Sequence, residues 1–228
     1  MPMNKITVII PAFNEEKHIA KVIECIKKNK NVDEIIVVDN NSTDKTGMIA
    51  ESLGVKTVCC KEQGKGYAME KGLRYATNDY ILFADADICN YEHEFVENMI
   101  KPLISDNYDL VKATFEREGG RITELVAKPL LELLFPELSF FEQPLSGIIA
   151  GKKELFNMIT FEKDYGVDIG ILIDSYLLNA KITQVSIGKI LNDSQDWKDL
   201  THMARQVSKA ILERAHIKSK KDDYIAEC

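Results

Sequence analysis

Short apolar runs alternate with helical patterns along residues 1–90 of the chain. The apolar runs, each bounded by polar or turn-forming residues, cover residues 5–11, 33–39, 55–60 and 80–85. Runs of this length and boundary predict buried strands. Between the first two, apolar residues recur at intervals of three and four, at Ile19, Val22, Ile23 and Ile26. This spacing predicts an amphipathic helix, with Asn14 as a candidate N-cap and Ser42 or Thr43 in the same role for the next helix.

The second half of the sequence is less regular. Apolar runs predict three further strands, at residues 108–115, 143–151 and 182–188, and helical spacing predicts two helices, near residues 169–178 and 200–217. Residues 116–124 form a glycine-rich turn that opens another helix, which is expected to be kinked or interrupted near Pro129. The whole pattern predicts an α/β fold: one domain with a mixed, mainly parallel sheet flanked by helices.

Polar clusters follow three of the predicted strands, at residues 11–15, 39–42 and 85–87. In an open parallel sheet, ligands bind outside the carboxyl ends of the strands. We therefore expect these clusters to meet in one crevice.

Composition narrows the class of ligand. The 228 residues carry a net charge of −7, which disfavours nonspecific nucleic-acid binding because phosphate neutralisation needs a basic surface. No run approaches the length of a membrane helix, so the protein is expected to be cytoplasmic. The five cysteines form neither a disulfide framework nor a metal knuckle, and we expect reduced thiols.

The pair Asp85 and Asp87 ends the strand at residues 80–85. Carboxylates at this place suit a divalent cation, Mg²⁺ or Mn²⁺, held against a diphosphate. An isolated Asp-x-Asp is also common in solvated turns. The buried strand before it favours the functional interpretation, because it delivers both carboxylates to the crevice.

A second candidate is the Gly64-Lys65-Gly66 turn before a helical pattern. Bare backbone amides, a helix N-terminus and an ammonium group at one point favour a phosphate-bearing ligand. A plain glycine turn with a solvated lysine is the alternative. Asp39 is a candidate acceptor for hydrogen bonds from a base or ribose, whereas Ser42, Thr43 and Asp44 suit helix capping equally well.

The segments "IIPAFNEE", "VVDNNSTDKT", "GKGYAMEKGL" and "FADAD" resemble, in this order, the nucleotide-sugar half of family 2 glycosyltransferases with the GT-A fold. The later segments "GGRITELVAKPLL" and "YGVDIG" are more specific and resemble the glucosyl-3-phosphoglycerate synthases. The resemblance covers nearly the whole chain. It implies one GT-A domain over residues 1–228, with a nucleotide-sugar half at 1–90 and an acceptor half at 91–228.

This resemblance implies a retaining transfer of glucose from a nucleotide sugar, usually UDP-glucose, to 3-phosphoglycerate. It also implies roles for individual positions. The donor would be bound by Pro11, Ala12, Glu15, Asp39, Asn40, Lys65, Asp85 and Ala86. The acceptor would be bound by Gly120, Arg121, Thr123, Tyr165 and Asp168. Catalysis would depend on Asp87, Lys65 and Arg121. Homodimers are implied as well.

The metal site departs from the family pattern. Family members commonly supply a histidine after the strand at residues 182–188, where this chain has Asn192 followed by Asp193. The resemblance implies Asp87 and Asn192 as ligands of Mg²⁺ or Mn²⁺, and an oxygen of either Asn192 or Asp193 suits Mg²⁺. Asp168 stands where relatives often have glutamate, so the preferred donor or acceptor stays open.

Two other functions remain open from the sequence. One is a transferase that acts on a polyprenyl phosphate or a polysaccharide, although the tail after His216 is too short and mixed in charge to anchor to a membrane. The other is a non-catalytic nucleotide-sugar-binding protein, which the missing metal histidine favours. GDP-glucose and GDP-mannose also remain alternatives to UDP-glucose. The four histidines, in predicted helices, are assigned no catalytic role.

Overall fold

The computed structural model of the chain describes residues 5–88, 90–91, 94–116, 120–191 and 197–226. Within them, seven strands form one sheet in the order β3-β2-β1-β4-β6-β5-β7. β6 is antiparallel to its neighbours β4 and β5, and the remaining neighbours pair in parallel. The strands are β1 (Ile6–Ala12), β2 (Val32–Asp39), β3 (Lys56–Cys59), β4 (Tyr80–Phe83), β5 (Leu110–Glu116), β6 (Ile149–Lys152) and β7 (Ile182–Lys189). The predicted mixed, mainly parallel sheet is confirmed.

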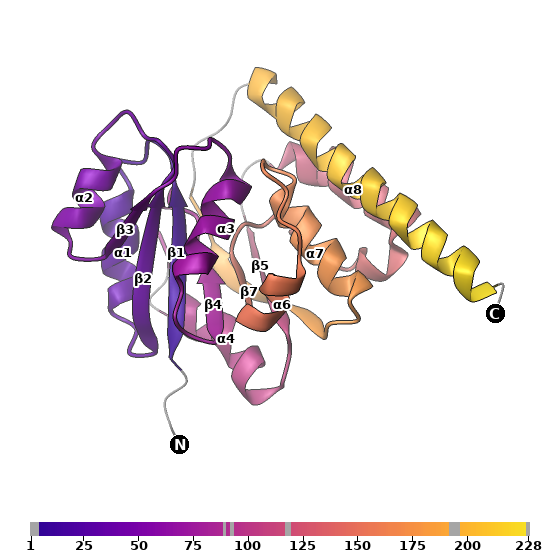
Figure 1. Ribbon diagram of the computed structural model, residues 1–228, viewed down its shortest axis with the longest axis horizontal. Coiled ribbons are helices and arrows are strands. Elements are labelled where there is room, and N and C mark those ends of the chain that lie inside the picture. Colours follow the sequence, from indigo (N-terminus) through magenta and orange to yellow (C-terminus); the bar gives the residue numbers. More distant parts are fainter. Residues whose placement is uncertain (1–4, 89, 92–93, 117–119, 192–196, 227–228) are drawn as a thin grey trace.

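Helices cover both faces of this sheet (Figure 1). One face packs against α1 (Ile19–Lys27), α2 (Thr46–Ser52) and α4 (Phe95–Ser105), and the other against α3 (Lys65–Tyr75), α6 (Lys153–Met158) and α7 (Val167–Leu177). β1 serves both faces because its side chains alternate: Val8 and Ile10 join the first core, and Ile9 joins the second. The double coverage explains why these strands read as continuous apolar runs.

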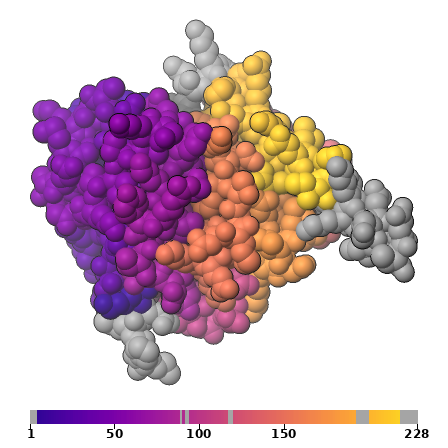
Figure 2. Space-filling view, viewed as in Figure 1, coloured from indigo at the N-terminus to yellow at the C-terminus, as the bar shows by residue number. Residues whose placement is uncertain are grey.

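A third apolar cluster lies beside the sheet and is built from helices. It joins the inner side of α7 to η1 (Thr123–Ala127), α5 (Lys128–Leu134), η2 (Pro136–Leu138) and the long α8 (Trp197–Ala226). In Figure 1, α8 runs along this side of the molecule. Among the described residues no helix combines the length and apolarity that a membrane crossing requires. In Figure 2 the orange surface of the second half directly borders the purple surface of the first.

The helix with Pro129 is interrupted as predicted. A π-helical turn ends at Ala127, and α5 begins at Lys128 with Pro129 in its first turn. Proline lacks the N–H that a continuous helix needs, and a π turn is one way to absorb that loss.

Two predicted boundaries are wrong. The strand predicted at residues 143–151 begins at Ile149, because the backbone around Ser146 and Gly147 lies against buried polar side chains and forms no ladder. The helix predicted at residues 200–217 is longer, because α8 spans Trp197–Ala226.

The predicted N-caps are also wrong. α1 begins after His18 and α2 after Lys45, and the side chain of neither N-cap residue makes a capping hydrogen bond. Instead, the loops after β1 and β2 bind each other: the Asn14 amide donates to Ser42 Oγ at 3.0 Å, and the Thr43 amide donates to Asn14 Oδ1 at 2.8 Å. Partners from another loop have replaced the local capping bonds expected for these residue types.

Candidate active site

A cavity of about 490 Å³ opens at the carboxyl ends of the strands. Its walls come from the ends of β1, β2, β4, β5 and β7 together with α3, α7 and α8. The volume lies within the range of small-ligand sites. Of the donor-site residues named from the sequence, the cavity is lined by Pro11, Ala12, Glu15, Asn40, Lys65, Asp85 and Ala86. Asp87, Tyr165 and Asp168 line it too. The expected convergence of strand ends is therefore confirmed.

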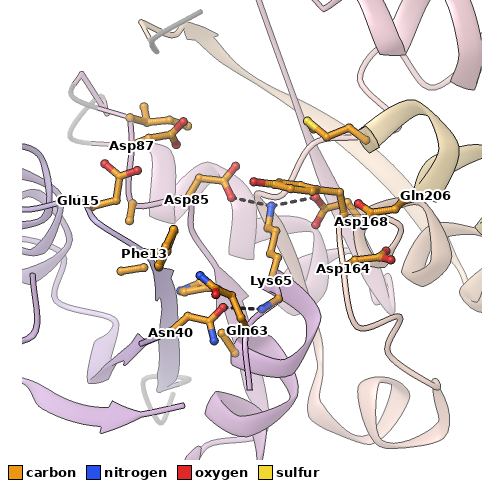
Figure 3. A pocket seen from close by; sticks show the side chains of 18 of the residues that line it. Phe13, Glu15, Asn40, Gln63, Lys65, Asp85, Asp87, Asp164, Asp168 and Gln206 are labelled. Carbon is orange, nitrogen blue, oxygen red and sulfur yellow. Dashed lines mark hydrogen bonds and ion pairs between the residues drawn. The ribbon is translucent and has the colours of Figure 1, made fainter. Parts of the chain in front are cut away.

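Lys65 lies at the centre of this cavity, between two carboxylates (Figure 3). Its Nζ atom is 2.9 Å from Asp85 Oδ1 and 2.8 Å from Asp168 Oδ2. Burial alone would lower the pKa of Lys65, but the charges of Asp168 and Asp85 raise it well above its ordinary value. Lys65 is therefore a fixed cation, held where a phosphate-bearing ligand would meet it.

The turn that presents Lys65 is held from two sides. Asn40, at the end of β2, accepts a hydrogen bond from the Gly64 amide at 2.8 Å and donates one to the Glu62 carbonyl at 2.6 Å. From the other side, the Glu162 carbonyl lies so close to Gly66 that an added Cβ would overlap it. Only glycine permits this approach, and the Gly-Lys-Gly sequence thus fixes the lysine against the second half of the chain.

The opposite wall of the cavity is acidic. Figure 3 places Glu15 and Asp87 together on the side of the cavity away from Asp164 and Asp168. The pKa of Asp87 is raised to about 6, first by burial and then by the negative charges of Asp85 and Glu15. Such mutual repulsion between carboxylates would be relieved by a bound cation.

The donor set fits a divalent metal that is completed by substrate. Among the described residues, no three His, Cys, Asp or Glu side chains lie close enough to hold a metal by themselves. Mg²⁺ is usually bound through one or two carboxylates together with substrate phosphates, so Asp87 beside a diphosphate would be sufficient. Asn192 and Asp193 lie outside the described residues, while Ile190, two residues before Asn192, lines the cavity.

Asp39 does not line the cavity. Its Oδ1 atom accepts a hydrogen bond from the Ser42 amide at 2.9 Å, and its Oδ2 atom lies against Gly47. The structure thus uses Asp39 to shape the loop after β2. Asp44 has a similar local task, because it accepts a hydrogen bond from the amide of Thr46, the first residue of α2.

Of the residues expected to bind the acceptor through the glycine-rich turn, none of Gly120, Arg121 and Thr123 lines the cavity. Gly120 has a φ of +83°, a conformation that favours glycine, and the helical segment begins at Arg121. The Arg121 side chain is exposed and that of Thr123 is buried. In the same helical segment, Glu124 forms an ion pair with Lys128.

Several cavity residues were missed from the sequence. Gln63 comes from the loop just before Gly64, and α8 contributes His202, Met203 and Gln206. His202 and Gln206 are joined by a 2.8 Å contact between their Nε2 atoms. The spacing of residues 202, 203 and 206 puts their side chains on one face of a helix. This shared face is the one feature of the sequence that could have indicated a common site for the three.

Two buried oxygen atoms in the cavity wall have no hydrogen-bond partner among the described residues. They are Oδ1 of Asp168 and Oε1 of Gln206. Buried acceptors normally have partners, so atoms of this kind in a cavity suit the hydroxyl groups of a ligand.

Comparison with known proteins identifies relatives of this chain. The profile of Glycosyl transferase family 2 matches residues 7–163. Glucosyl-3-phosphoglycerate synthase from Mycolicibacterium smegmatis is 37% identical over an alignment of 236 positions, which covers 93% of this chain and 78% of the relative. The enzyme of the same name from Petrotoga mobilis is 35% identical, and the alignment covers 92% of this chain and 73% of that enzyme.

Solved structures give the same answer. Glucosyl-3-phosphoglycerate synthase from Mycobacterium tuberculosis, in complex with Mn²⁺, UDP-glucose and phosphoglyceric acid, superposes with a TM-score of 0.87 at 38% identity. The match covers 93% of this chain and 80% of that one. The seven-stranded sheet is thus the GT-A sheet, and the chain belongs to glycosyl transferase family 2 and, within it, to the glucosyl-3-phosphoglycerate synthases.

Proposed function

We propose that this chain transfers glucose from UDP-glucose to the hydroxyl group of 3-phosphoglycerate, with retention at the anomeric carbon, and forms glucosyl-3-phosphoglycerate. The observation that carries the proposal is the ion-paired Lys65 between Asp85 and Asp168, beside Asp87 in one cavity. Relatives named for this activity supply the substrates: one structure holds Mn²⁺, UDP-glucose and phosphoglyceric acid, and another holds UDP and glucosyl-3-phosphoglycerate.

The donor occupies the side of the cavity formed by the first half of the chain. In this proposal the nucleoside lies against Pro11, Ala12, Glu15 and Asn40, with Phe13 beside them. Asp39 acts indirectly, by holding the loop after β2. The diphosphate faces Lys65, whose fixed positive charge stabilises the negative charge that develops on departing UDP.

A divalent cation, Mg²⁺ or Mn²⁺, belongs to the donor site, with Asp87 and Asn192 as its proposed protein ligands. When bound, such a cation supplies Lewis-acid stabilisation of the leaving diphosphate. Asp87 is suited to hold it because its neighbours are carboxylates and its own charge is poorly compensated. Asp85 and Ala86 face the diphosphate and sugar.

The acceptor is placed by the second half of the chain. Gly120, Arg121 and Thr123 form the proposed site for its phosphate and carboxylate, because a helix N-terminus and a guanidinium both favour anions. Tyr165 and Asp168 complete the site next to the sugar. The acceptor hydroxyl then lies on the same face as the leaving diphosphate, and an oxygen of that diphosphate takes its proton.

A product-mass experiment tests the reaction. UDP-glucose, GDP-glucose and GDP-mannose are each incubated with 3-phosphoglycerate or 2-phosphoglycerate, with and without Mg²⁺ or Mn²⁺. We expect glucosyl-3-phosphoglycerate and UDP from UDP-glucose with 3-phosphoglycerate, and only when a cation is present. Binding of UDP-glucose without turnover under every metal would overturn the proposal.

We also infer that the protein is cytoplasmic, because both proposed substrates are charged, water-soluble metabolites. We infer in addition that it forms a homodimer. Large apolar side chains are exposed on neighbouring elements of the helical side, with exposed fractions of 72% for Leu125 and 78% for Leu133. Exposed apolar residues that gather on one surface are typical of protein interfaces. Sedimentation of the wild type against Leu133→Glu checks this, and a monomeric wild type would contradict it.

A further inference from the structure

Lys112 lies within β5, and its side chain is fully buried. Lysine is rarely buried completely unless its ammonium group is paired. Here the Nζ atom donates hydrogen bonds to two backbone carbonyl oxygens, of Ser146 at 2.7 Å and of Asp168 at 3.0 Å. Burial lowers the pKa of Lys112 to about 7. Burying the Lys112 ammonium group carries a desolvation cost, and the reaction proposed above gives Lys112 no role. The groups that its two hydrogen bonds hold in place therefore indicate what Lys112 does.

The two carbonyl groups belong to the segments that enclose Lys65. Ser146 precedes Gly147, and an added Cβ at Gly147 would overlap both the Nζ atom of Lys65 and a carboxylate oxygen of Asp85. On the other side, the Asp168 carboxylate itself accepts the hydrogen bond from Lys65. Lys112 therefore holds the backbone on both sides of the Lys65 ammonium group.

The charges of this group are also linked. The charged side chains that face Lys112 are Asp168 on α7, Lys65 on α3 and Asp85 after β4. The pKa of Asp168 is raised by burial, and the positive charges of Lys65 and Lys112 both oppose that rise. When Lys112 is protonated, two ammonium groups balance two carboxylates in a region of low polarity, where each charge has a stronger effect than it would in water.

We propose that Lys112 is a positioning residue for glycosyl transfer: by fixing the backbone at Ser146 and Asp168, it keeps Lys65 between Asp85 and Asp168. Lys112 does not touch the substrates and acts through these neighbours. The inference rests on the proposed function, since it names what sets the geometry of that same site.

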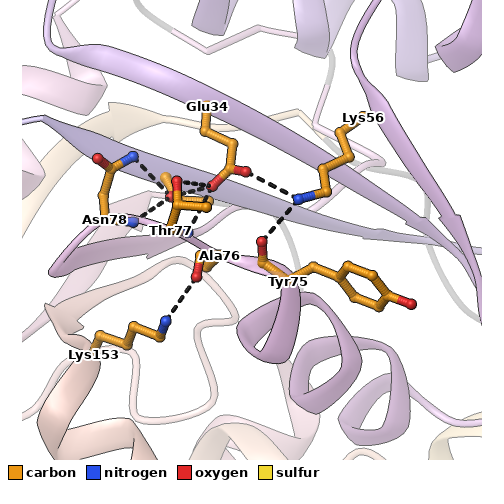
Figure 4. Close-up of polar contacts among 8 residues, drawn as sticks. Glu34, Lys56, Tyr75, Ala76, Thr77, Asn78 and Lys153 are labelled. Atoms are coloured by element: carbon orange, nitrogen blue, oxygen red, sulfur yellow. Dashed lines mark hydrogen bonds and ion pairs between the residues drawn. The ribbon is translucent and has the colours of Figure 1, made fainter.

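The test compares Lys112→Met with Lys153→Met. Methionine has a similar length and no charge. Lys153 is a matched control because its Nζ atom also donates to a backbone carbonyl, that of Ala76 at 2.7 Å, in a separate polar cluster (Figure 4). For Lys112→Met we expect kcat to fall about tenfold or more, because small misplacements of reacting groups are costly, with a much smaller change in KM.

The pH profile gives a second readout that a purely structural role would not move. Without the Lys112 charge the pKa of Asp168 should rise, so the acidic limb of the kcat/KM profile should move to higher pH. Lys153→Met should leave kcat and the profile unchanged, even where its Tm falls as much. A folded Lys112→Met with wild-type kcat and profile would overturn the inference, as would a loss proportional to unfolded protein.

A measurement on protein that retains Lys112 covers the case in which Lys112→Met does not fold. The side-chain ¹⁵N resonance of Lys112 is compared between the wild type and Asp168→Asn. A shift is expected because the lysine faces that carboxylate, and an unchanged resonance would overturn the inference. Failure of the wild type to transfer glucose would instead count against the proposed function, which this resonance does not test.

Discussion

The Nζ atom of Lys65 donates a hydrogen bond to Oδ2 of Asp168 at 2.8 Å, although 103 residues separate the two positions in the sequence. Lys65 begins α3, and Asp168 lies in the first turn of α7. Their contact joins the proposed donor side of the cavity to the proposed acceptor side. A substitution on the proposed donor side should therefore alter binding on the proposed acceptor side, and the reverse should hold as well.

Replacement of Asp87 by asparagine should separate activity from stability. Loss of the proposed metal ligand should lower transfer about 100-fold or more, the scale of losing one electrostatic contact in a transition state. In metal-free protein the same change should raise Tm by a few degrees, because the raised pKa shows that the charged carboxylate is disfavoured there. Product formation and unfolding in a chelator measure the two effects.

Asp79→Asn is the matched control for Asp87→Asn. Asp79 is exposed and lies just before the first residue of β4, at the end of the strand away from Asp87. This variant should therefore keep both wild-type activity and wild-type Tm. Full activity of Asp87→Asn would refute the proposed metal role.

Gln206→Leu should weaken the binding of UDP-glucose and spare that of UDP. The unpartnered Oε1 atom of Gln206 and the nearby carboxylate of Asp168 suit neutral hydroxyl donors. The hexose carries such hydroxyl groups, whereas in the proposed binding mode the nucleotide lies on the other side of the cavity. The loss of one such hydrogen bond predicts a fall in affinity of about five- to tenfold. Calorimetry with each ligand measures it.

Arg205→Ala, an exposed neighbour on α8, serves as the control for Gln206→Leu. Equal losses of UDP and UDP-glucose affinity in Gln206→Leu would contradict the assignment to the hexose.

Glu34 makes a contribution to stability that should depend on pH. Burial alone would raise its pKa, but hydrogen bonds from Thr7, Thr77 and Lys56 lower it (Figure 4). A carboxyl group with a lowered pKa in the folded state stabilises the protein above its unfolded value, here 4.5, and loses that contribution as pH falls through the folded pKa. Glu34→Gln should therefore cost about 1–2 kcal/mol at pH 7.

Urea unfolding at several pH values checks this prediction. The difference between the wild type and Glu34→Gln should shrink below pH 4.5, the unfolded value. Asp33→Asn, next to it on β2, breaks only an exposed ion pair with Lys5 and should change little at any pH. A difference independent of pH would show that the charge of Glu34 is not its source.

Arg214 should be essential for holding α8 against α7. Its guanidinium binds both carboxylate oxygens of Asp174, at 2.8 and 2.7 Å, and one of Glu162 at 2.7 Å, with 6% of the side chain exposed. Arg214→Ala leaves two carboxylates without their buried cation, and we expect a loss of about 3–5 kcal/mol in unfolding free energy. Arg74→Ala, which breaks an exposed pair with Glu70, should cost far less.

Those residues that follow directly from a buried strand were predictable from the sequence. β4 carries Asp85 and Asp87 to the cavity because four apolar residues fix the strand and the sheet fixes where it ends. Lys65 was predictable for a related reason, since glycines on both sides mark a turn before a helix. In these cases local pattern and tertiary position agree.

Other residues depend on partners that are remote in sequence. Asn14 and Ser42 look like caps, yet they bond to each other's loops across 28 residues. Gln206 reaches the cavity through the packing of α8 on α7, and its helical spacing alone does not say which face meets a ligand. Lys112 reads as an interruption of an apolar strand, and its carbonyl partners lie 34 and 56 residues away.

The antiparallel strand β6 has a practical consequence for protein engineering. It comes from the second half of the chain, yet it lies between β4 and β5 and pairs with both. A chimaera joined near residue 90 would give β4 a foreign neighbour along its whole length, and a fragment ending there would expose an unpaired strand edge. We therefore expect that the proposed donor and acceptor halves cannot be swapped between relatives by a junction near residue 90, because a swap has to keep β6 together with β4.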